Sequence, residues 1–276
     1  MRKAREVGIN FLDDARYNDE TGRAPLKTGY SEVVFGELFR AAGWIRDDVI
    51  VANKLWWEFW PEQSAAQELD ASLGRMKLDH LDLAYAERPP TGLGVEQIVD
   101  EVSGLIEAGK LRAWGVLNWP ADLITEAGAV AARRGVAGPC AAQLPYNVVI
   151  RTVVEDPEME QALDLANASV VASYTLYGGA LSGKYEDPAA GGRVTAGIDN
   201  RDYSAPLAAG RRLTALAGDL DAKPAALAIA FTLHNPRVAT ALFGATTPEQ
   251  IEVNLAAIEL AGRLDQAALD RLRNIT

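Results

Sequence analysis

The chain has little of the chemistry that disulfides and metal sites need. Its 276 residues include one cysteine, Cys140, and two histidines, His80 and His234. A single cysteine cannot form an intramolecular disulfide, so folding does not require an oxidising compartment. One cysteine and two histidines also fall short of the four ligands of a structural zinc site. We therefore expect neither a disulfide framework nor a bound metal.

Long apolar runs and an excess of positive charge are also absent. No stretch reaches the ~20 apolar residues of a membrane span. The basic start of the chain is not followed by the apolar segment of a signal peptide. The net charge of −11 gives no overall attraction for nucleic acid or for an anionic membrane. We expect a cytoplasmic protein.

Apolar, β-branched runs alternate with longer amphipathic segments along the whole chain. The runs are continuously apolar, as is typical of parallel strands buried on both faces. Strands are predicted at residues 8–14, 48–55, 81–87, 111–118, 140–147, 169–176 and 238–245. Helices are predicted at residues 31–42, 61–78, 95–110, 121–135, 157–168, 223–236, 247–260 and 265–275. Ser31 is the expected N-cap of the first helix, and Pro61 the expected first turn of the second.

This alternation predicts parallel βα units, which occur both in doubly wound sheets and in (β/α)8 barrels. No G-x-G-x-x-G follows any strand, so the phosphate loop of a Rossmann fold is missing and a barrel is favoured. A closed barrel needs eight strands, and only seven are found. Residues 1–7 have the pattern of a helix end. We predict a single barrel domain over residues 1–276 that lacks its first strand.

Two long segments follow predicted strands, at residues 18–30 and 186–206. Barrel active sites form at the carboxyl ends of the strands, and long loops in a compact domain are usually functional lids or disordered segments. Four side chains at strand ends could handle a proton. They are Asp13, Tyr17, Lys54 and Glu87. A lysine ammonium lowers the pKa of a nearby phenol, and an aspartate would hold that ammonium in place. Such a tyrosine can protonate an oxygen on which negative charge develops.

The segments that carry these residues resemble the motifs of a known family. GINFLDDARY resembles the aldo-keto reductase segment G-x-N-F-x-D-T-A-x-x-Y. Further segments match family motifs in the same order, and together they cover nearly the whole chain: SEVVFGELF, VIVANK, LDHLDLAYAERPP, GKLRAWGVLNW, QLPYN, YTLYGGALSGKY and GATTPEQIEVN.

The resemblance implies an enzyme that transfers hydride from NADPH (or NADH) to an aldehyde, ketone or conjugated enone, without a metal. Tyr17 would be the general acid, with Lys54 and Asp13 as its partners and Glu87 beside them. The residues that would bind the cofactor are Asn118 and Gln143 at the nicotinamide, Leu176 at the pyrophosphate, and Gly244, Thr246, Gln250 and Asn254 at the adenosine end.

Several positions depart from the family pattern. Glu87 stands where most members have a catalytic histidine, and one residue is missing between Ala15 and Tyr17. Leu117 replaces a serine, and Ser173 stands where an aromatic ring often stacks on the nicotinamide. Glutamate at the histidine position resembles the steroid double-bond reductase branch, which implies that Glu87 polarises a conjugated ketone.

One alternative is a cofactor-binding barrel of low turnover that acts as a sensor or interaction subunit, like the potassium-channel β subunits that the family also contains. An aromatic cluster after Lys54 is expected to line a pocket: Trp56, Trp57, Phe59 and Trp60.

Overall fold

The computed structural model describes residues 1–19, 22–187, 189–196 and 202–275. Its strands form one seven-stranded sheet with the order β1-β2-β3-β4-β5-β6-β7. The strands are β1 (Phe11–Asp13), β2 (Ile50–Leu55), β3 (Leu81–Ala86), β4 (Leu111–Leu117), β5 (Ala141–Pro145), β6 (Ser169–Ser173) and β7 (Val238–Ala241). The pairs β1–β2, β2–β3, β3–β4, β4–β5 and β6–β7 are parallel. This is the strand order of a (β/α)8 barrel with one strand missing, as predicted.

Two compact units can be distinguished within the chain. The first comprises Met1–Gln143 and Pro157–Ser169, and the second comprises Leu144–Asp156 and Val170–Thr276. The single barrel domain inferred from the sequence stays a prediction. Among the described residues, no helix is both long enough and apolar enough to cross a membrane.

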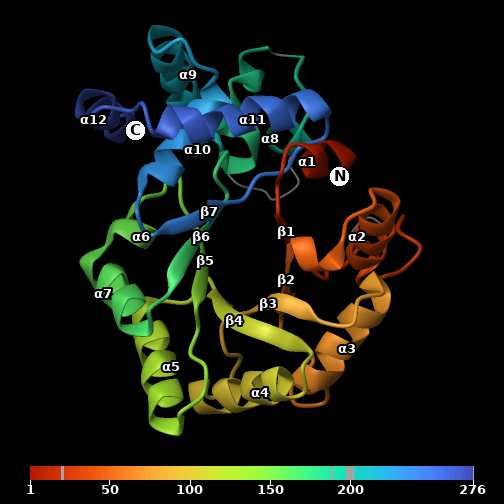
Figure 1. Ribbon diagram of the computed structural model, residues 1–276. Coiled ribbons are helices and arrows are strands. Elements are labelled where there is room, and N and C mark those ends of the chain that lie inside the picture. Colours follow the sequence, from red (N-terminus) through yellow and green to blue (C-terminus); the bar gives the residue numbers. More distant parts are fainter. Residues whose placement is uncertain (20–21, 188, 197–201, 276) are drawn as a thin grey trace. The chain divides into compact units, whose positions relative to one another are not determined.

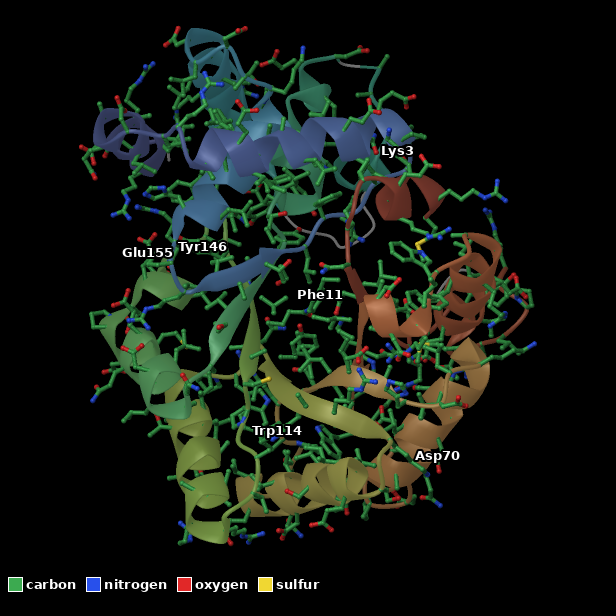
Figure 2. All side chains as sticks on the ribbon, viewed as in Figure 1. Lys3, Phe11, Asp70, Trp114, Tyr146 and Glu155 are labelled. Carbon is green, nitrogen blue, oxygen red and sulfur yellow. The ribbon has the colours of Figure 1, made fainter. Side chains whose placement is uncertain are left out.

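The first unit contains strands β1 to β4 with helices lying outside them (Figure 1). Its helices are α1 (Arg2–Glu6), α2 (Tyr30–Ala41), the 3-10 helix η1 (Arg46–Asp48), α3 (Ala65–Met76), α4 (Val95–Glu107), α5 (Ala121–Arg134) and α7 (Pro157–Ala166). Every residue of β3 is buried, as is every residue of β2 after Ile50. Trp114 of β4 is fully buried, and its indole N–H donates to the carbonyl of Ala137 at 2.8 Å (Figure 2). This core fixes the strand ends that carry the candidate site.

Helices α2 and α3 pack closely because of Gly36. A β-carbon at Gly36 would lie 2.2 Å from the carbonyl oxygen of Met76, so a larger residue would force the helices apart. The start predicted for α3 was wrong. Ser64, rather than Pro61, begins this helix, because its hydroxyl accepts from the amide of Gln67 and the Gln67 side chain accepts in return from the Ser64 amide.

The start predicted for α2 was also wrong, since Gly29 is its N-cap. Ser31 lies inside the helix and donates its hydroxyl to the carbonyl of Ala15 at 2.6 Å. The segment between β1 and α2 has an antiparallel bridge between Asn18 and Thr28. Residues 20–21 of this segment lie outside the described residues.

The second unit is built around a buried helix, α10. Its helices are α6 (Thr152–Glu155), the 3-10 helices η2 (Tyr177–Ser182) and η3 (Lys184–Glu186), α8 (Arg193–Ala196), α9 (Ser204–Asp219), α10 (Pro224–His234), α11 (Pro248–Ala261) and α12 (Gln266–Arg273). Eight consecutive residues of α10 are buried, from Ala225 to Thr232. Figure 2 labels Tyr146 and Glu155 of this unit, and the Tyr146 hydroxyl donates to the Glu155 carboxylate at 2.7 Å.

The segment 186–206, predicted as a loop, is partly helical. Helix α8 lies within it, and α9 begins at Ser204. Residues 188 and 197–201 lie outside the described residues. Helix α9 was not predicted from the sequence, because Gly210 and Gly218 weaken its helical pattern. Gly210 is required there, since a β-carbon would lie 2.2 Å from the carbonyl oxygen of Ala180.

Candidate functional site

An ion pair joins the ends of β1 and β2 in the first unit. The Lys54 ammonium lies 2.5 Å from the Asp13 carboxylate and donates a second hydrogen bond, of 2.9 Å, to the backbone carbonyl of Asp14. Lys54 is only 5% exposed. Burying a charge is costly unless it is paired and hydrogen-bonded, so this arrangement holds the lysine in one position. The structure thus brings together two of the four side chains expected at the acid site.

Asp13 also contacts a residue expected to bind the cofactor. The Gln143 side-chain amide donates to the second oxygen of the Asp13 carboxylate at 3.2 Å. Burial raises the pKa of Asp13 above its ordinary value, and the charge of Lys54 and its hydrogen bond partly offset that rise. Gln143 therefore lies in the same cluster as the ion pair.

Tyr85 is a member of this cluster that sequence reasoning missed. It pairs in register with Lys54 across β2 and β3, and the Lys54 ammonium lies 5.5 Å from the centre of its ring. Tyr85 is fully buried. Burial raises the pKa of its hydroxyl far above the ordinary value, and the Asp13 charge adds to the rise, so Tyr85 stays a neutral phenol. Strand alternation could have indicated it, because Tyr85 and Glu87 are two residues apart and share a face.

Asp14 is a second residue near the ion pair that sequence reasoning did not single out. It stands where the family segment has threonine. Burial raises the pKa of Asp14 to about 6, and the nearby Glu32 and Asp13 charges add to the rise. One of its carboxyl oxygens is buried and has no hydrogen-bond partner among the described residues.

Tyr17 follows β1 on a segment held by its backbone. Its amide donates to the Ser31 hydroxyl at 3.4 Å, and its carbonyl accepts from the Gly29 amide at 2.9 Å. The side chain is 60% exposed, and its ring centre lies 6.3 Å from that of Trp56. The hydrogen bonds described for Lys54 go to Asp13 and Asp14. The exposure of Tyr17 and its ring contact place the phenol at the rim, beside Trp56.

Glu87 lies directly after β3, at the edge where β4 also ends. Its amide donates to the carbonyl of Leu55 at 2.9 Å, and its side chain accepts from the Arg88 amide at 3.1 Å. The Arg88 side chain in turn donates to the backbone carbonyl of Asn118. Asn118 donates its own amide to the carbonyl of Gln143 at 3.0 Å. Glu87 and Asn118 thus directly follow β3 and β4, and Gln143 lies within the next strand, β5.

The remaining cofactor positions lie in the second unit. The carbonyl of Leu176 accepts from the Gly179 amide at 2.8 Å and from the Leu181 amide at 3.2 Å, which folds the backbone into η2. Before α11, the Gln250 side chain accepts from the Thr246 amide at 2.7 Å and from its hydroxyl at 3.2 Å. Gly244, Thr246 and Gln250 are exposed, whereas Asn254 is buried. The structure therefore brings Thr246 and Gln250 together at a helix start, where backbone N–H groups favour anions.

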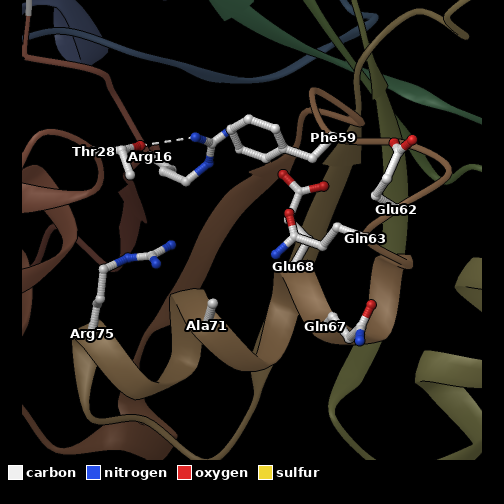
Figure 3. Close-up of a pocket in the computed structure, with 9 residues that line it drawn as sticks. All are labelled: Arg16, Thr28, Phe59, Glu62, Gln63, Gln67, Glu68, Ala71 and Arg75. Carbon is white, nitrogen blue, oxygen red and sulfur yellow. Dashed lines mark hydrogen bonds between the residues drawn. The ribbon is translucent and has the colours of Figure 1, made fainter.

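A pocket of about 370 Å³ lies in the first unit, lined by the segments after β1 and β2 and by α3 (Figure 3). Its lining residues are Arg16, Thr28, Phe59, Glu62, Gln63, Gln67, Glu68, Ala71 and Arg75. Phe59 is the one member of the expected aromatic cluster among them. Glu68 is buried and accepts from the amides of Trp56 at 2.8 Å and Trp57 at 3.2 Å, and burial raises its pKa. The pocket does not include Asp13, Lys54 or Glu87, so it is separate from the ion pair.

The chain is similar to known proteins along its whole length. A model of the Aldo/keto reductase family matches residues 1–276. A probable voltage-gated potassium channel subunit beta of Oryza sativa subsp. japonica is 30% identical over 297 residues, covering 100% of this chain and 85% of the relative. One from Arabidopsis thaliana is 28% identical, covering 100% of this chain and 85% of the relative. A putative voltage-gated potassium channel subunit beta of Schizosaccharomyces pombe is 28% identical, covering 100% of this chain and 82% of the relative.

Proposed function

Because this chain belongs to the aldo/keto reductase family, we propose that it is an NAD(P)H-dependent oxidoreductase that reduces an aldehyde, a ketone or a conjugated enone. The observation that carries the proposal is the buried Lys54–Asp13 ion pair at the ends of β1 and β2. A charged lysine held at a strand end is what a tyrosine acid needs nearby. We expect the enzyme to act in the cytoplasm.

In the proposed mechanism, Tyr17 donates its hydroxyl proton to the substrate oxygen. The reduced nicotinamide supplies the hydride when it is bound. Lys54 stabilises the phenolate that Tyr17 becomes, and Asp13 fixes the position of the Lys54 ammonium. Since Tyr17 is 60% exposed, it can regain a proton from solvent after each turnover. Glu87 is proposed to polarise the substrate at the next strand end.

The residues proposed to hold the cofactor fit its chemistry in donor type. Asn118 and Gln143 carry amides that can bind the nicotinamide carboxamide. The Gln143 amide nitrogen already donates to Asp13, so its oxygen is the atom proposed to accept from the carboxamide. In the second unit, Leu176 is proposed to bind the pyrophosphate through its backbone, and Gly244, Thr246, Gln250 and Asn254 the adenosine end. The cofactor would be NADPH or, less well bound, NADH.

The general-acid role of Tyr17 can be tested by replacing it with phenylalanine. Acid catalysis contributes about 10²–10⁴-fold to a rate, so kcat of Tyr17→Phe should fall by at least about a hundredfold, with the Kd of NADPH unchanged. Tyr30→Phe, at the start of α2, is the control and should keep its turnover. Unchanged kcat in Tyr17→Phe would end the assignment.

A second candidate function is a cofactor-binding subunit with little turnover. It is favoured by the names of the relatives, which are potassium channel subunits beta. In that case the chain would bind the nicotinamide, and the redox state of the bound cofactor would change how the chain interacts with a partner. Titrating NADPH against tryptophan fluorescence, with turnover measured on the same sample, separates the two functions. Binding without oxidation of NADPH by any aldehyde or enone would favour the subunit.

A further inference from the structure

The Glu58 carboxylate contacts both chain neighbours of Tyr17. One of its oxygens accepts from the Arg16 guanidinium at 2.6 Å, and the other accepts from the Asn18 side-chain amide at 3.2 Å. Glu58 belongs to the segment after β2, whereas Arg16 to Asn18 belong to the segment after β1. The Glu58 side chain therefore joins the segment after β2 to the segment that carries Tyr17, through the residues immediately before and after Tyr17.

The Arg16 guanidinium makes this contact rigid. Arg16 is 7% exposed and donates a further hydrogen bond to the Thr28 hydroxyl at 2.9 Å (Figure 3). It also lies 5.5 Å from the centre of the Phe59 ring. A buried guanidinium with two hydrogen-bond partners and an aromatic face has little freedom to move. Arg16 is thus held by Thr28 of its own segment and by Glu58 and Phe59 of the segment after β2.

The Tyr17 side chain has little burial of its own to fix its position. It is 60% exposed, and one residue of the family segment is missing between Ala15 and Tyr17. Its position therefore depends on the backbone bonds to Ser31 and Gly29, on the ring contact with Trp56 and on contacts that hold its chain neighbours. The Glu58 carboxylate supplies such contacts immediately before and after Tyr17.

We propose that Glu58 is a positioning residue for Tyr17, which holds the segment after β1 so that the phenol reaches the reacting oxygen. This inference rests on the proposed role of Tyr17 as the general acid. The Arg16 hydrogen bond holds the pKa of Glu58 below its ordinary value, so the carboxylate stays charged further into the acidic range. A misplacement of about 1 Å can cost about a hundredfold in rate.

The test is a double-mutant cycle with Tyr17→Phe and Glu58→Ala. Glu62→Gln is the control, because Glu62 lies on the same segment after β2 and lines a pocket together with Arg16, but has no part in the contacts of Glu58 with Arg16 and Asn18. Glu58→Ala should lower kcat roughly ten- to hundredfold and change the Kd of NADPH little. In the Tyr17→Phe background it should have almost no further effect. In the Glu58→Ala single variant, the basic limb of the pH profile of kcat should shift upward, towards the ordinary tyrosine pKa of about 10.

The other outcomes are distinguishable. A loss of kcat in Glu58→Ala that adds fully to that of Tyr17→Phe would overturn the positioning role while leaving the proposed function intact. Unchanged turnover in Tyr17→Phe would overturn both the acid assignment and the role of Glu58. Amide hydrogen exchange provides a readout that needs no turnover. Exchange at Tyr17 and Asn18 should be faster in Glu58→Ala than in Glu62→Gln, and equal exchange would also overturn the proposal.

Discussion

The Lys54 ammonium and the Asp13 carboxylate lie 2.5 Å apart, with side chains that are 4% and 18% exposed. Breaking a buried pair leaves one charge uncompensated and costs about 3–5 kcal/mol. Lys54→Met should therefore lower the free energy of unfolding in urea by about that amount. Lys110→Met is the control. It breaks the exposed pair with Asp70, which is 37% and 52% exposed, and should cost no more than about 1 kcal/mol. Equal losses of the free energy of unfolding in the two variants would contradict the claim that the buried Lys54–Asp13 pair is costlier to break than an exposed pair.

Asp14 should make stability fall as the pH rises. Burial raises the pKa of Asp14 from its ordinary value of 3.8 to about 6, so the folded protein favours the protonated acid. The stability contributed by the protonated Asp14 carboxyl is fully present below pH 3.8 and is lost as the pH rises through about 6. Asp14→Asn should therefore gain stability over wild type, and the gain should be about 1 kcal/mol larger at pH 8 than at pH 5. Thermal unfolding at the two pH values checks this prediction.

A matched control for that experiment is Asp202→Asn. Asp202 is exposed, and backbone and side-chain hydrogen bonds from Ser204 lower its pKa. It should therefore show no gain that grows between pH 5 and pH 8. A constant gain for Asp14→Asn across this range would mean that Asp14 is ionised in the folded protein at pH 5.

The Tyr85 ring should stabilise the protein through its cation–π contact with the Lys54 ammonium. A desolvated contact of this kind is worth about 2 kcal/mol. Tyr85→Phe keeps the ring, whereas Tyr85→Leu removes it together with some packing. We expect the free energy of unfolding to fall by about 2 kcal/mol more in Tyr85→Leu than in Tyr85→Phe because of this contact. Repeating both substitutions on a Lys54→Met background isolates it, since the difference should shrink there. An undiminished difference would assign it to packing alone.

Glu87 should influence which bond of the substrate is reduced. A carboxyl that polarises a conjugated ketone leaves more room than an imidazole ring, so Glu87→His should shift preference from enones towards plain carbonyls. The measurement is the ratio of kcat/KM for one enone to that for one simple aldehyde, in the wild type and the variant. Identical ratios would mean that Glu87 does not set the reaction type.

The preference for NADPH over NADH should be modest. Cations bind a phosphate dianion well, but the stretch from Gly244 to Thr247 and Gln250 offers only hydroxyl and amide groups. Thr246 and Gln250 also bond to each other, so part of their capacity is already used. We expect the ratio of the two Kd values to stay below about a thousandfold, or roughly 4 kcal/mol. A larger ratio would require a cation near the 2′-phosphate.

Much of the fold could be predicted from the order of apolar runs. All seven predicted strands are present, each shorter than its run, because continuous burial marks a parallel strand but not where its hydrogen bonds end. Starts of helices were less certain. Pro61 and Ser64 are both common at helix starts, and only the reciprocal bonds with Gln67 decide for Ser64. Helix α9 was missed because Gly210 and Gly218 weaken its helical pattern, and of these Gly210 is required for close packing against Ala180.

The candidate site was predictable in its residue types but not in its contacts. Asp13 is the last residue of β1, and Lys54 lies near the end of the neighbouring strand β2, two residues after Ala52, the register partner of Asp13. The order of the strands therefore predicts that the two side chains lie close together. The bond from Gln143 to Asp13 and the contacts of Glu58 with Arg16 and Asn18 depend on side-chain conformation. No spacing in the sequence indicates them, because the partners lie 130 and about 40 residues apart.

The most direct test of the proposed function is a single-turnover experiment with bound NADPH. The protein is saturated with NADPH and mixed rapidly with an aldehyde or an enone, and the absorbance of the reduced nicotinamide is followed. We predict a first-order loss of that absorbance with one equivalent of reduced product, slowed by at least about a hundredfold in Tyr17→Phe. Bound NADPH that stays reduced with every substrate would contradict the account.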